Sequence, residues 1–506
     1  MKHIARSTLI IAFFFGLTKI ISIFRTALVA RQFGLSPQLD AYNAANNLPD
    51  LLAALISGGA LAIAFIPVLS EYLDRNGRPT AWALFSRVAN LAFVFTASAS
   101  VLLALFAGPL VRYVIAPGFI PSQQALAVNL MRIDLIGTLI FALSGLVSAG
   151  LQANQHFLLP AMAPVLYSLG QIFGVIVLAP TTPYHLGPIT LPALGMGIYG
   201  LVYGVILGAL LHLGIQIPGL IHYQFRWSPV ISLHDPGVRK VLVLLGPSLI
   251  SMFMFQLNFV ARDNLASRLG PGSVTALTYG FFIMQVPETL LGTALAIALL
   301  PTLSEQIARG DFDVFCQTLN HALRILLALA LPITALLFVG IRPIIQLFFA
   351  FDAAGTQLMV STTRAFLGSI LGYAMVEIGV RAFYSQQKPL PPLVTAFLRM
   401  VTYIGLSVLL FRSLGTTGIA LADTIAVTFE GCALFYLLNR RFSGVLAVQK
   451  TLVRIIPVAL LSAFGAAVLM RLLPLPALPA TLVALTLGGL AVLPFTWPEL
   501  KLLIKM

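Results

Sequence analysis

The chain alternates between long hydrophobic runs and short polar connections. Apolar runs of about 20 residues, the length an α-helix needs to cross a bilayer, recur along the whole sequence. They predict fourteen membrane-spanning helices, at residues 7–30, 40–65, 86–111, 127–150, 158–180, 193–220, 240–261, 273–300, 318–346, 362–380, 390–411, 417–438, 451–472 and 477–496. Lys2 and Arg6 precede the first run as in a signal peptide. No small-residue cleavage site follows, so we interpret this run as an uncleaved span.

One twelve-residue segment of the chain occurs twice. Residues 60–71 read Ala-Leu-Ala-Ile-Ala-Phe-Ile-Pro-Val-Leu-Ser-Glu, and residues 294–305 read Ala-Leu-Ala-Ile-Ala-Leu-Leu-Pro-Thr-Leu-Ser-Glu, so nine of the twelve positions are identical. Further matches follow in the same order: Pro109 with Pro343, Gln155 with Gln386, and Pro160 with Pro391. Several matches in one order indicate two homologous halves. A repeat of half the chain is typical of transporters, in which two helical bundles face each other across a cleft.

The repeat also predicts the domain organisation. We expect a first lobe at residues 1–225 and a second at 236–445, joined by a linker that contains His234-Asp235-Pro236-Gly237, a helix stop and restart signal. Residues 446–506 hold two further spans without a counterpart in the first lobe. The expected fold is therefore an all-α polytopic membrane protein with about fourteen transmembrane helices. It comprises two pseudo-symmetric six-helix lobes around a central cavity, plus two C-terminal helices.

Composition supports a membrane protein. Hydrophobic residues make up 59% of the chain and charged residues only 9%, and the mean hydropathy is +0.97, too apolar for a water-soluble globule. Lys and Arg collect in the loops that share a side with both termini, which predicts cytoplasmic termini. The net charge of +14 is spread over short loops with no basic domain, so we expect no nucleic-acid partner.

Nothing in the sequence indicates chemistry on a covalent bond. The two cysteines, Cys316 and Cys432, form neither a disulfide framework nor a metal-binding spacing. No Walker A loop, histidine metal motif or nucleophile elbow is present. We therefore expect a protein that is not an enzyme, with no cofactor and no metal. The missing ATP motif favours an ion gradient or the membrane potential as the energy source.

Several predicted spans carry polar residues along one helix face, where a lipid-facing helix would not. Ionisable groups at membrane depth usually face a cavity or a partner, so these stripes mark the candidate substrate site. The predicted cavity residues are Lys19, Ser22, Arg25, Asn43, Asn47, Asp50, Gln256, Asn258, Arg262 and Gln285. Gly58, Gly59 and Pro287 interrupt two of these spans and are predicted hinges, because glycine and proline weaken a helix.

Other interpretations of these residues remain open. Arg262 and Asp263 also fit an ion pair at the membrane interface, and Asn43 and Asn47 fit hydrogen bonds between helices. Lys19 and Arg25 lie on a helix without an acidic residue. They require either an acidic partner, for which Asp40 and Asp50 are the candidates, or an anionic ligand.

Several motifs resemble one transporter family. They are Phe24-Arg25-x-x-x-Val29-Ala30-Arg31-x-Phe33-Gly34, Leu48-Pro49-x-Leu51-Leu52, Ala116-Pro117-Gly118-Phe119, Leu299-Leu300-Pro301 and Ala382-Phe383-Tyr384-Ser385. In this order they are similar to the MurJ/MviN lipid II flippases of the multidrug/oligosaccharidyl-lipid/polysaccharide exporter superfamily. The resemblance implies a monomer in the bacterial inner membrane. It also implies alternating access, which moves an undecaprenyl-pyrophosphate-linked peptidoglycan precursor to the outer leaflet for cell-wall synthesis.

The chain departs from this family pattern at several positions. Where the family carries an Asp-Arg pair and then an acidic residue before Pro287, this sequence has Phe281, Phe282 and Gln285. Lys19 replaces the usual Arg. A less basic cavity leaves two alternatives open, an exporter of another lipid-linked saccharide or small molecule and a diverged membrane scaffold that does not transport. The expected partners are a lipid-linked anionic substrate, membrane lipids and a coupled ion. Among the candidates, Arg25 suits the pyrophosphate best, because guanidinium matches phosphate geometry.

Overall fold

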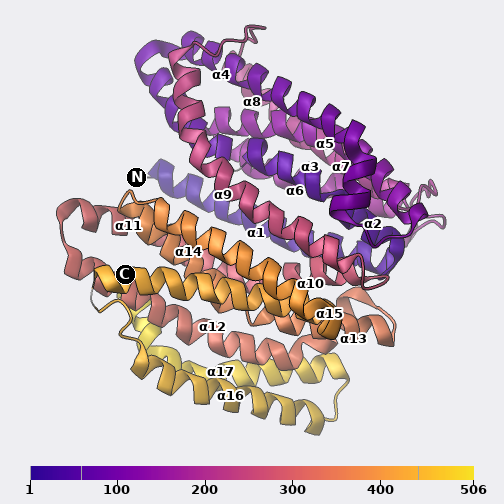
Figure 1. The fold of residues 1–506 in the computed structure, drawn as a ribbon, viewed down its shortest axis with the longest axis vertical. Coiled ribbons are helices and arrows are strands. Elements are labelled where there is room, and N and C mark those ends of the chain that lie inside the picture. Colours follow the sequence, from indigo (N-terminus) through magenta and orange to yellow (C-terminus); the bar gives the residue numbers. More distant parts are fainter. Residues whose placement is uncertain (1, 59, 443, 506) are drawn as a thin grey trace. The chain divides into compact units, whose positions relative to one another are not determined.

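A computed structural model describes residues 2–58, 60–442 and 444–505, and it is helical apart from one short hairpin (Figure 1). Its elements are α1 (Lys2–Phe33), α2 (Pro37–Ala45), α3 (Asn47–Ala53), η1 (Ala54–Gly58), α4 (Ala60–Leu110), η2 (Val111–Ile115), α5 (Pro121–Ala153), α6 (Leu158–Phe173), η3 (Gly174–Leu178), β1 (His185–Leu186), β2 (Ile189–Thr190), α7 (Tyr199–Gly214), α8 (Ile217–His222), α9 (Pro236–Ala266), α10 (Ser273–Glu288), η4 (Thr289–Thr293), α11 (Ala294–Arg309), α12 (Phe312–Phe349), α13 (Ala353–Leu367), α14 (Ile370–Ser385), α15 (Leu390–Arg441), α16 (Gln449–Leu472) and α17 (Ala477–Lys505). The η elements are single π-helical turns. The predicted all-α class is confirmed.

The chain forms two compact units, residues 1–271 and 272–506. Helix α9 belongs to the first unit, where it packs against α3 and α4. The sequence repeat instead grouped this helix with the second half of the chain. The domains predicted at residues 1–225, 236–445 and 446–506 follow the sequence repeat rather than these contacts, and they stay a prediction.

Within the described residues, eleven helices are long and apolar enough to cross a membrane. Two of them, Ala64–Ile115 and Leu390–Arg441, have 52 residues each. At 1.5 Å per residue such a helix would be about 78 Å long, more than twice the ~30 Å hydrocarbon core. Each contains a glycine with non-helical backbone, Gly77 or Gly415, at which two helices meet. Dividing these two helices gives thirteen spans, and α9 (Pro236–Ala266), which is not among the eleven, lies at the remaining predicted span, residues 240–261, so the helices follow the predicted order.

The second predicted span, residues 40–65, is the one that departs most from a single straight helix. It consists of α2, α3, η1 and the start of α4. The break after α2 lies at Asn46. The side-chain amide of Asn47 donates a 3.1 Å hydrogen bond to the carbonyl oxygen of Ala44. Asparagine side chains compete with the helix for such backbone groups. Hydropathy detects the apolar run and does not detect this local competition.

The internal repeat of the sequence has structural counterparts in both units. The π-helical turns η1 and η4 directly precede the two copies of the repeated segment. Gln155 and Gln387 both have left-handed backbone, with φ of 60° and 57°, so the structural counterpart of Gln155 is one position after the Gln386 that the sequence matched. The following N–H group in each case closes the preceding helix, from His156 to Leu151 O at 2.9 Å and from Lys388 to Phe383 O at 3.0 Å. The two halves thus end equivalent helices in the same way.

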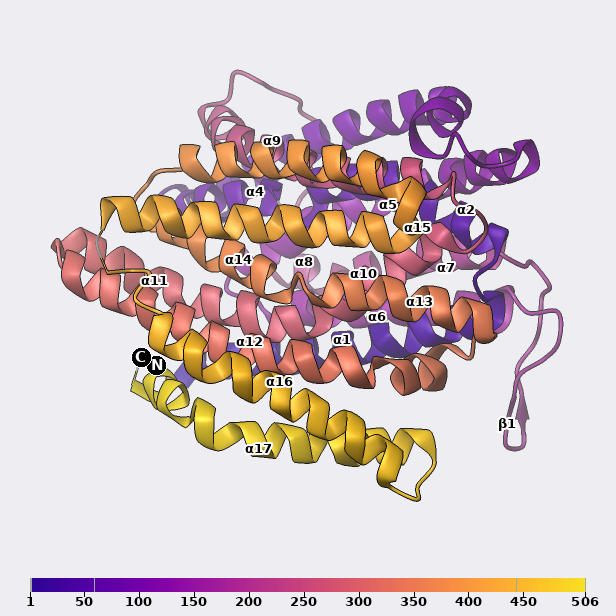
Figure 2. The same cartoon turned by 60° about the horizontal axis from the view of Figure 1, so that its bottom comes forward.

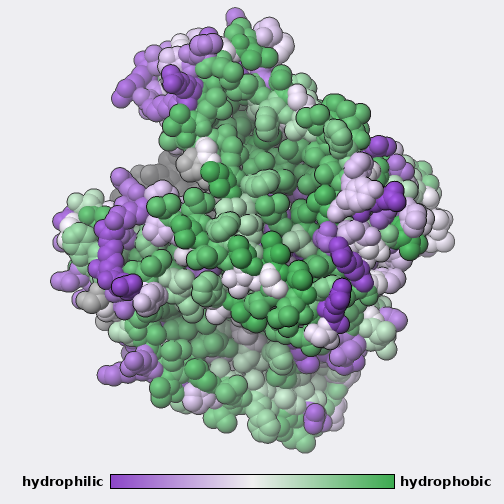
Figure 3. All heavy atoms as spheres, viewed as in Figure 1, coloured by the Kyte–Doolittle hydropathy of each residue, from purple (hydrophilic) through white to green (hydrophobic). Residues whose placement is uncertain are grey.

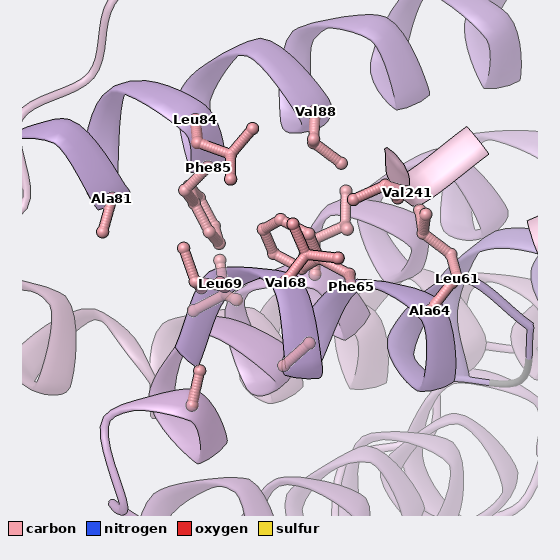
Figure 4. Close-up of a cluster of buried hydrophobic side chains, with 14 of the residues drawn as sticks. Leu61, Ala64, Phe65, Val68, Leu69, Ala81, Leu84, Phe85, Val88 and Val241 are labelled. Carbon is pink, nitrogen blue, oxygen red and sulfur yellow. The ribbon is translucent and has the colours of Figure 1, made fainter. Parts of the chain in front are cut away.

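In the first unit, a hydrophobic core joins α4, α5 and α9. Figure 4 shows Phe65 and Phe85 at its centre, with Leu69, Val88 and Val241 around them. The rings of Phe65 and Phe85 lie 5.8 Å apart, and Trp82 meets Phe85 edge to face at 5.5 Å. This core therefore holds α9 against the hairpin that α4 forms.

Glycines form a close seam between α6–η3 and α7. A Cβ atom added to Gly170 would lie 2.4 Å from the Cα of Gly208, and one added to Gly174 would lie 2.7 Å from the Cα of Gly204. Larger side chains have no space there. Small residues four apart let membrane helices approach backbone to backbone, which strengthens packing where no hydrophobic force acts between helices.

In the second unit, the last two helices pack against each other and both against α12 (Figure 2). They carry many exposed apolar side chains, among them Leu460, Leu461 and Phe464 on α16. Hydrophobic residues also cover most of the surface visible in Figure 3. Such a surface suits a lipid environment and would be unusual in water.

Candidate functional site

The candidate site of the first unit begins at Arg25 on α1. Helix α1 packs against α6, and the Arg25 guanidinium donates a hydrogen bond to the side-chain oxygen of Gln171. The sequence predicted an acidic partner or an anionic ligand for this residue. Its partner is a neutral amide, and no ion pair among the described residues includes Arg25. The positive charge of the guanidinium is therefore not neutralised by Gln171.

The two other predicted residues of α1 lie along the same helix as Arg25. Lys19 is half-buried, with its ammonium 5.7 Å from the ring centroid of Phe15, and it takes part in no ion pair within the described ranges. The carbonyl oxygen of Ser22 accepts a 2.9 Å hydrogen bond from the Thr26 hydroxyl. Thus α1 presents two half-buried cations without a carboxylate bonded to either.

Asn47, Arg262 and Asp263 form a buried polar group between α3 and α9. The Arg262 Nε donates to Asp263 Oδ1 at 2.7 Å, and the side chains are 8% and 0% exposed. Asn47 donates a 2.7 Å hydrogen bond to the other oxygen of Asp263. The ion pair that was one of the two interpretations of Arg262 and Asp263 is present, and it is buried within the unit. The Asn47 side chain thus forms a hydrogen bond between two helices. Such a bond was the alternative to a place in a substrate cavity.

The remaining predicted residues of this unit lie near these groups. Asp50 on α3 is exposed, and its backbone oxygen accepts a 3.4 Å contact from the Gln256 amide of α9. Arg25 lies within electrostatic range of Asp50. Asn43 is half-buried on α2, and Asn258 donates to Met254 O of its own helix at 3.3 Å. The Asn258 side-chain oxygen is buried, and no described residue donates a hydrogen bond to it. Of the predicted residues in this unit, Asn47 and Arg262 meet at Asp263, whereas Gln256 reaches only the backbone of Asp50.

Gln285 and Pro287 lie on α10, in the second unit. Gln285 is half-buried, and its backbone oxygen accepts a 2.8 Å hydrogen bond from Thr289. Pro287 lies inside α10, two residues before η4 begins at Thr289, and Gly58 ends η1, so one predicted hinge is beside a π-helical turn and the other is in one. Gly59 falls outside the described residues.

Phe281 lies at the position of the family's Asp-Arg pair. Its ring packs edge to face against the rings of Phe366 and Tyr373, with centroids 5.7 and 5.8 Å apart.

Several buried polar residues were missed at the sequence level. Asp134 on α5 is 5% exposed and lies within electrostatic range of Asp50. In the second unit, Arg399 pairs with Asp423 at 3.2 Å and Glu430 at 3.4 Å. These are charged residues inside apolar spans, which is a signal visible in the sequence. Gln171 carries no charge, so only the fold identifies it as the partner of Arg25.

The comparisons with known proteins agree with this architecture. The sequence model of the family described as "Lipid II flippase MurJ" matches residues 29–479. The lipid II flippase MurJ of Burkholderia cenocepacia is 29% identical over 449 residues, which cover 87% of this chain and 84% of the relative. A probable lipid II flippase MurJ of Vibrio cholerae is 25% identical over 446 residues, which cover 86% and 82%.

Solved structures share the fold. A lipid II flippase MurJ in an inward closed conformation aligns with a TM-score of 0.80 at 22% identity, over 98% of this chain and 100% of that one. An inward-facing multidrug transporter of the MATE family aligns with a TM-score of 0.70 at 15% identity, over 84% and 95%. At these identities the structures show the fold alone. The match of the family model over most of the sequence shows the family, and this chain belongs to the lipid II flippase MurJ family.

Proposed function

We propose that this protein is a flippase that carries an undecaprenyl-pyrophosphate-linked peptidoglycan precursor, lipid II, across the bacterial inner membrane for cell-wall synthesis. Membership of the MurJ family and the many apolar helices support this function. The family consists of transporters, so the proposed action breaks no covalent bond. The precursor moves from the cytoplasmic to the outer leaflet by alternating access, as in other transporters built from repeated halves.

The observation that carries the proposal is the hydrogen bond from Arg25 to the Gln171 amide. A guanidinium and a phosphate form bidentate hydrogen bonds, which are roughly twice as strong as bonds between neutral groups. A pyrophosphate that reaches α1 would displace the neutral amide of Gln171 and form a charged hydrogen-bonded pair with the Arg25 guanidinium. Lys19, six residues earlier, would add a second cation. Ser22, Asn43, Asn47, Asp50, Gln256, Asn258, Arg262 and Gln285 stay proposed cavity residues.

The transport cycle needs places at which helices bend, and we assign these to Gly58, Gly59 and Pro287. The π-helical turns η1 and η4 lie beside them at equivalent points of the repeat. Such turns are frequent at functional sites because their hydrogen-bond pattern is irregular. The proposal further includes cytoplasmic termini, a monomer, and an ion gradient or the membrane potential as the energy source.

Complementation tests the proposed function. A bacterial strain depleted of its own flippase should grow when this chain is expressed, and Arg25→Ala should not support growth although it inserts and accumulates normally. Gln171→Ala is the matched control, because it removes the partner and leaves the cation, and we expect it to support growth. Wild-type growth with Arg25→Ala would contradict the role of Arg25. Failure of the unaltered chain would contradict the proposed cargo.

A second candidate function is export of a different, less charged lipid-linked saccharide. Phe281 and Phe282 favour it, because they replace the second cation of the family pattern, and Phe281 is built into an aromatic cluster. A flipping assay with both lipids in reconstituted vesicles distinguishes the two candidates. Transport of neither lipid would favour a membrane scaffold instead.

A further inference from the structure

A cavity of about 590 Å³ lies inside the first unit, between η1, α4 and α9. All fifteen of its lining residues are hydrophobic. Helix α4 contributes Val88, Leu91 and Phe95, and α9 contributes a stripe that includes Leu245 and Phe253. Among the described residues no polar side chain lines the cavity, so this lining offers water no hydrogen-bond partner. Apolar cavities of this kind bind hydrocarbon.

The dimensions of the cavity fit a single hydrocarbon chain. Its lining along α9 extends from Val238 to Phe253, about 22 Å of helix at 1.5 Å per residue. That length exceeds half of the ~30 Å hydrocarbon core, so a chain inside would run from the interface past the middle of one leaflet.

Charged residues surround one end of the cavity. The lining residues Val88 and Leu233 are close in sequence to Arg87 and Asp235, which form an ion pair. The exposed Arg239 follows the lining residue Val238. Lys240, next to lining residue Val241, pairs with Glu71 at 2.5 Å, and its side chain is 52% exposed. Asp235 and Glu71, the two acidic residues at this end, therefore already form ion pairs with cationic side chains.

The segment before α9 adds two features of a membrane interface. Trp227 is 64% exposed, and its indole N–H donates a 2.8 Å hydrogen bond to Asn90 on α4, which holds the segment beside the cavity. Arg226 and Arg239 are exposed and take part in no ion pair within the parts of the chain that the structure describes. Interfacial tryptophan next to arginines without carboxylate partners is typical of helices that contact anionic lipid head groups.

We propose that this cavity binds one acyl chain of an anionic glycerophospholipid, whose head group lies at Arg226 and Arg239. The occupant needs one apolar chain of limited length and a negative charge at one end, and a phospholipid supplies both. The lining along α9, about 22 Å long, is shorter than the whole extended tail of a long polyprenyl lipid, so the cargo is the less favoured occupant. This lipid site is separate from Arg25 and does not depend on the proposed transport.

Lipid binding to the purified full-length chain tests the site. Palmitoyl-oleoyl phosphatidylglycerol and the phosphatidylcholine with the same chains would be added in detergent, and retained lipid would be counted by native mass spectrometry. We expect a preference of about tenfold or more for phosphatidylglycerol, because two cations lie at the mouth. The double variant Arg226→Gln/Arg239→Gln should lose that preference. Leu245→Trp should lower retention of both lipids about tenfold by filling the cavity. Leu460→Trp, on an exposed face of α16, is its control.

A second measurement remains informative if Leu245→Trp fails to fold. Phe253→Trp places an indole at the deep end of the cavity with little change in volume. Phosphatidylglycerol with brominated acyl chains should quench it at stoichiometric lipid, and the Leu460→Trp fluorescence should change little. Absence of quenching, or equal effects of the cavity variant and its control, would overturn the site. Quenching that polyprenyl phosphate relieves better than phosphatidylglycerol would overturn the assigned occupant.

Discussion

The side-chain amide of Asn47 donates a 2.7 Å hydrogen bond to the carboxylate of Asp263, which lies 216 residues further along the chain. This bond connects α3 with α9 across the inside of the first unit. Asp263 is fully buried and also accepts from Arg262. A buried carboxylate needs its lone pairs satisfied, because desolvation is expensive. Asn47 is therefore part of what holds the ion pair in place.

We expect Asn47→Ala to destabilise the protein by about 1–3 kcal/mol, the usual cost of leaving a buried acceptor without its donor. Asn47→Asp should destabilise it more, since a second carboxylate would face Asp263. Thermal unfolding in detergent, followed by tryptophan fluorescence, measures both effects. Asn154→Ala is the control, because that side chain bonds only its own helix, at 2.9 Å to Gly150 O. Equal melting temperatures for Asn47→Ala and the unaltered protein would contradict the structural role.

In the second unit, Arg399 should be essential for folding. Its side chain is 8% exposed and contacts Asp423 and Glu430, which are 9% and 3% exposed. It also donates a 2.6 Å hydrogen bond to the Tyr373 hydroxyl. Arg399→Met leaves two carboxylates buried without this cation, so we expect a loss of about 3–5 kcal/mol and poor accumulation in the membrane.

The triple variant Arg399→Met/Asp423→Asn/Glu430→Gln separates charge from packing. If the cost comes from the two carboxylates, the neutral triple variant should recover most of the melting temperature. A triple variant as unstable as Arg399→Met would show that packing around the guanidinium, and not its charge, is decisive.

The glycine seam should not accept even one methyl group. Gly170→Ala would place a Cβ 2.4 Å from the Cα of Gly208, and separating α6 from α7 should cost about 1–3 kcal/mol. Gly405→Ala is the matched control in α15, where the described residues place no atom within 4 Å of the added Cβ apart from the backbone of the same helix and the two chain neighbours. That change should leave the melting temperature unchanged or raise it slightly, because alanine favours a helix over glycine. Similar losses for both variants would argue against the seam.

Phe282→Arg tests whether the lost second cation matters for the cargo. If lipid II is the substrate, the added charge should maintain or raise the flipping rate, since it helps Arg25 and Lys19 to bind a pyrophosphate. If the substrate is less charged, the same change should lower transport, because a buried cation would lack a partner. The flipping assay should compare both lipids, with Phe282→Leu as the uncharged control. A rate that falls equally for Arg and Leu would mean that the aromatic ring itself is needed.

The sequence predicts the membrane spans well because a bilayer requires long apolar helices, and these are visible without knowledge of the fold. The halves of the repeat were visible for a similar reason, since residues 60–71 and 294–305 still share most of their residues. The partners of Arg25 and Asn47 were not predictable, because each bond joins residues more than a hundred positions apart. The break at Asn46 depends on side chains that compete for backbone groups, which hydropathy does not register.

The glycine seam limits how the first unit can change shape. Since α6 and α7 touch backbone to backbone, neither can slide past the other without bringing a side chain into space that only hydrogen occupies. We therefore expect the two helices to move together as one rigid body. Gln171 is fixed on this pair of helices beside Gly170, so a rearrangement that separates it from Arg25 moves α1 relative to α6 and α7 together. The Arg25–Gln171 contact would then open between α1 and the pair as a whole, and not by a change within the pair.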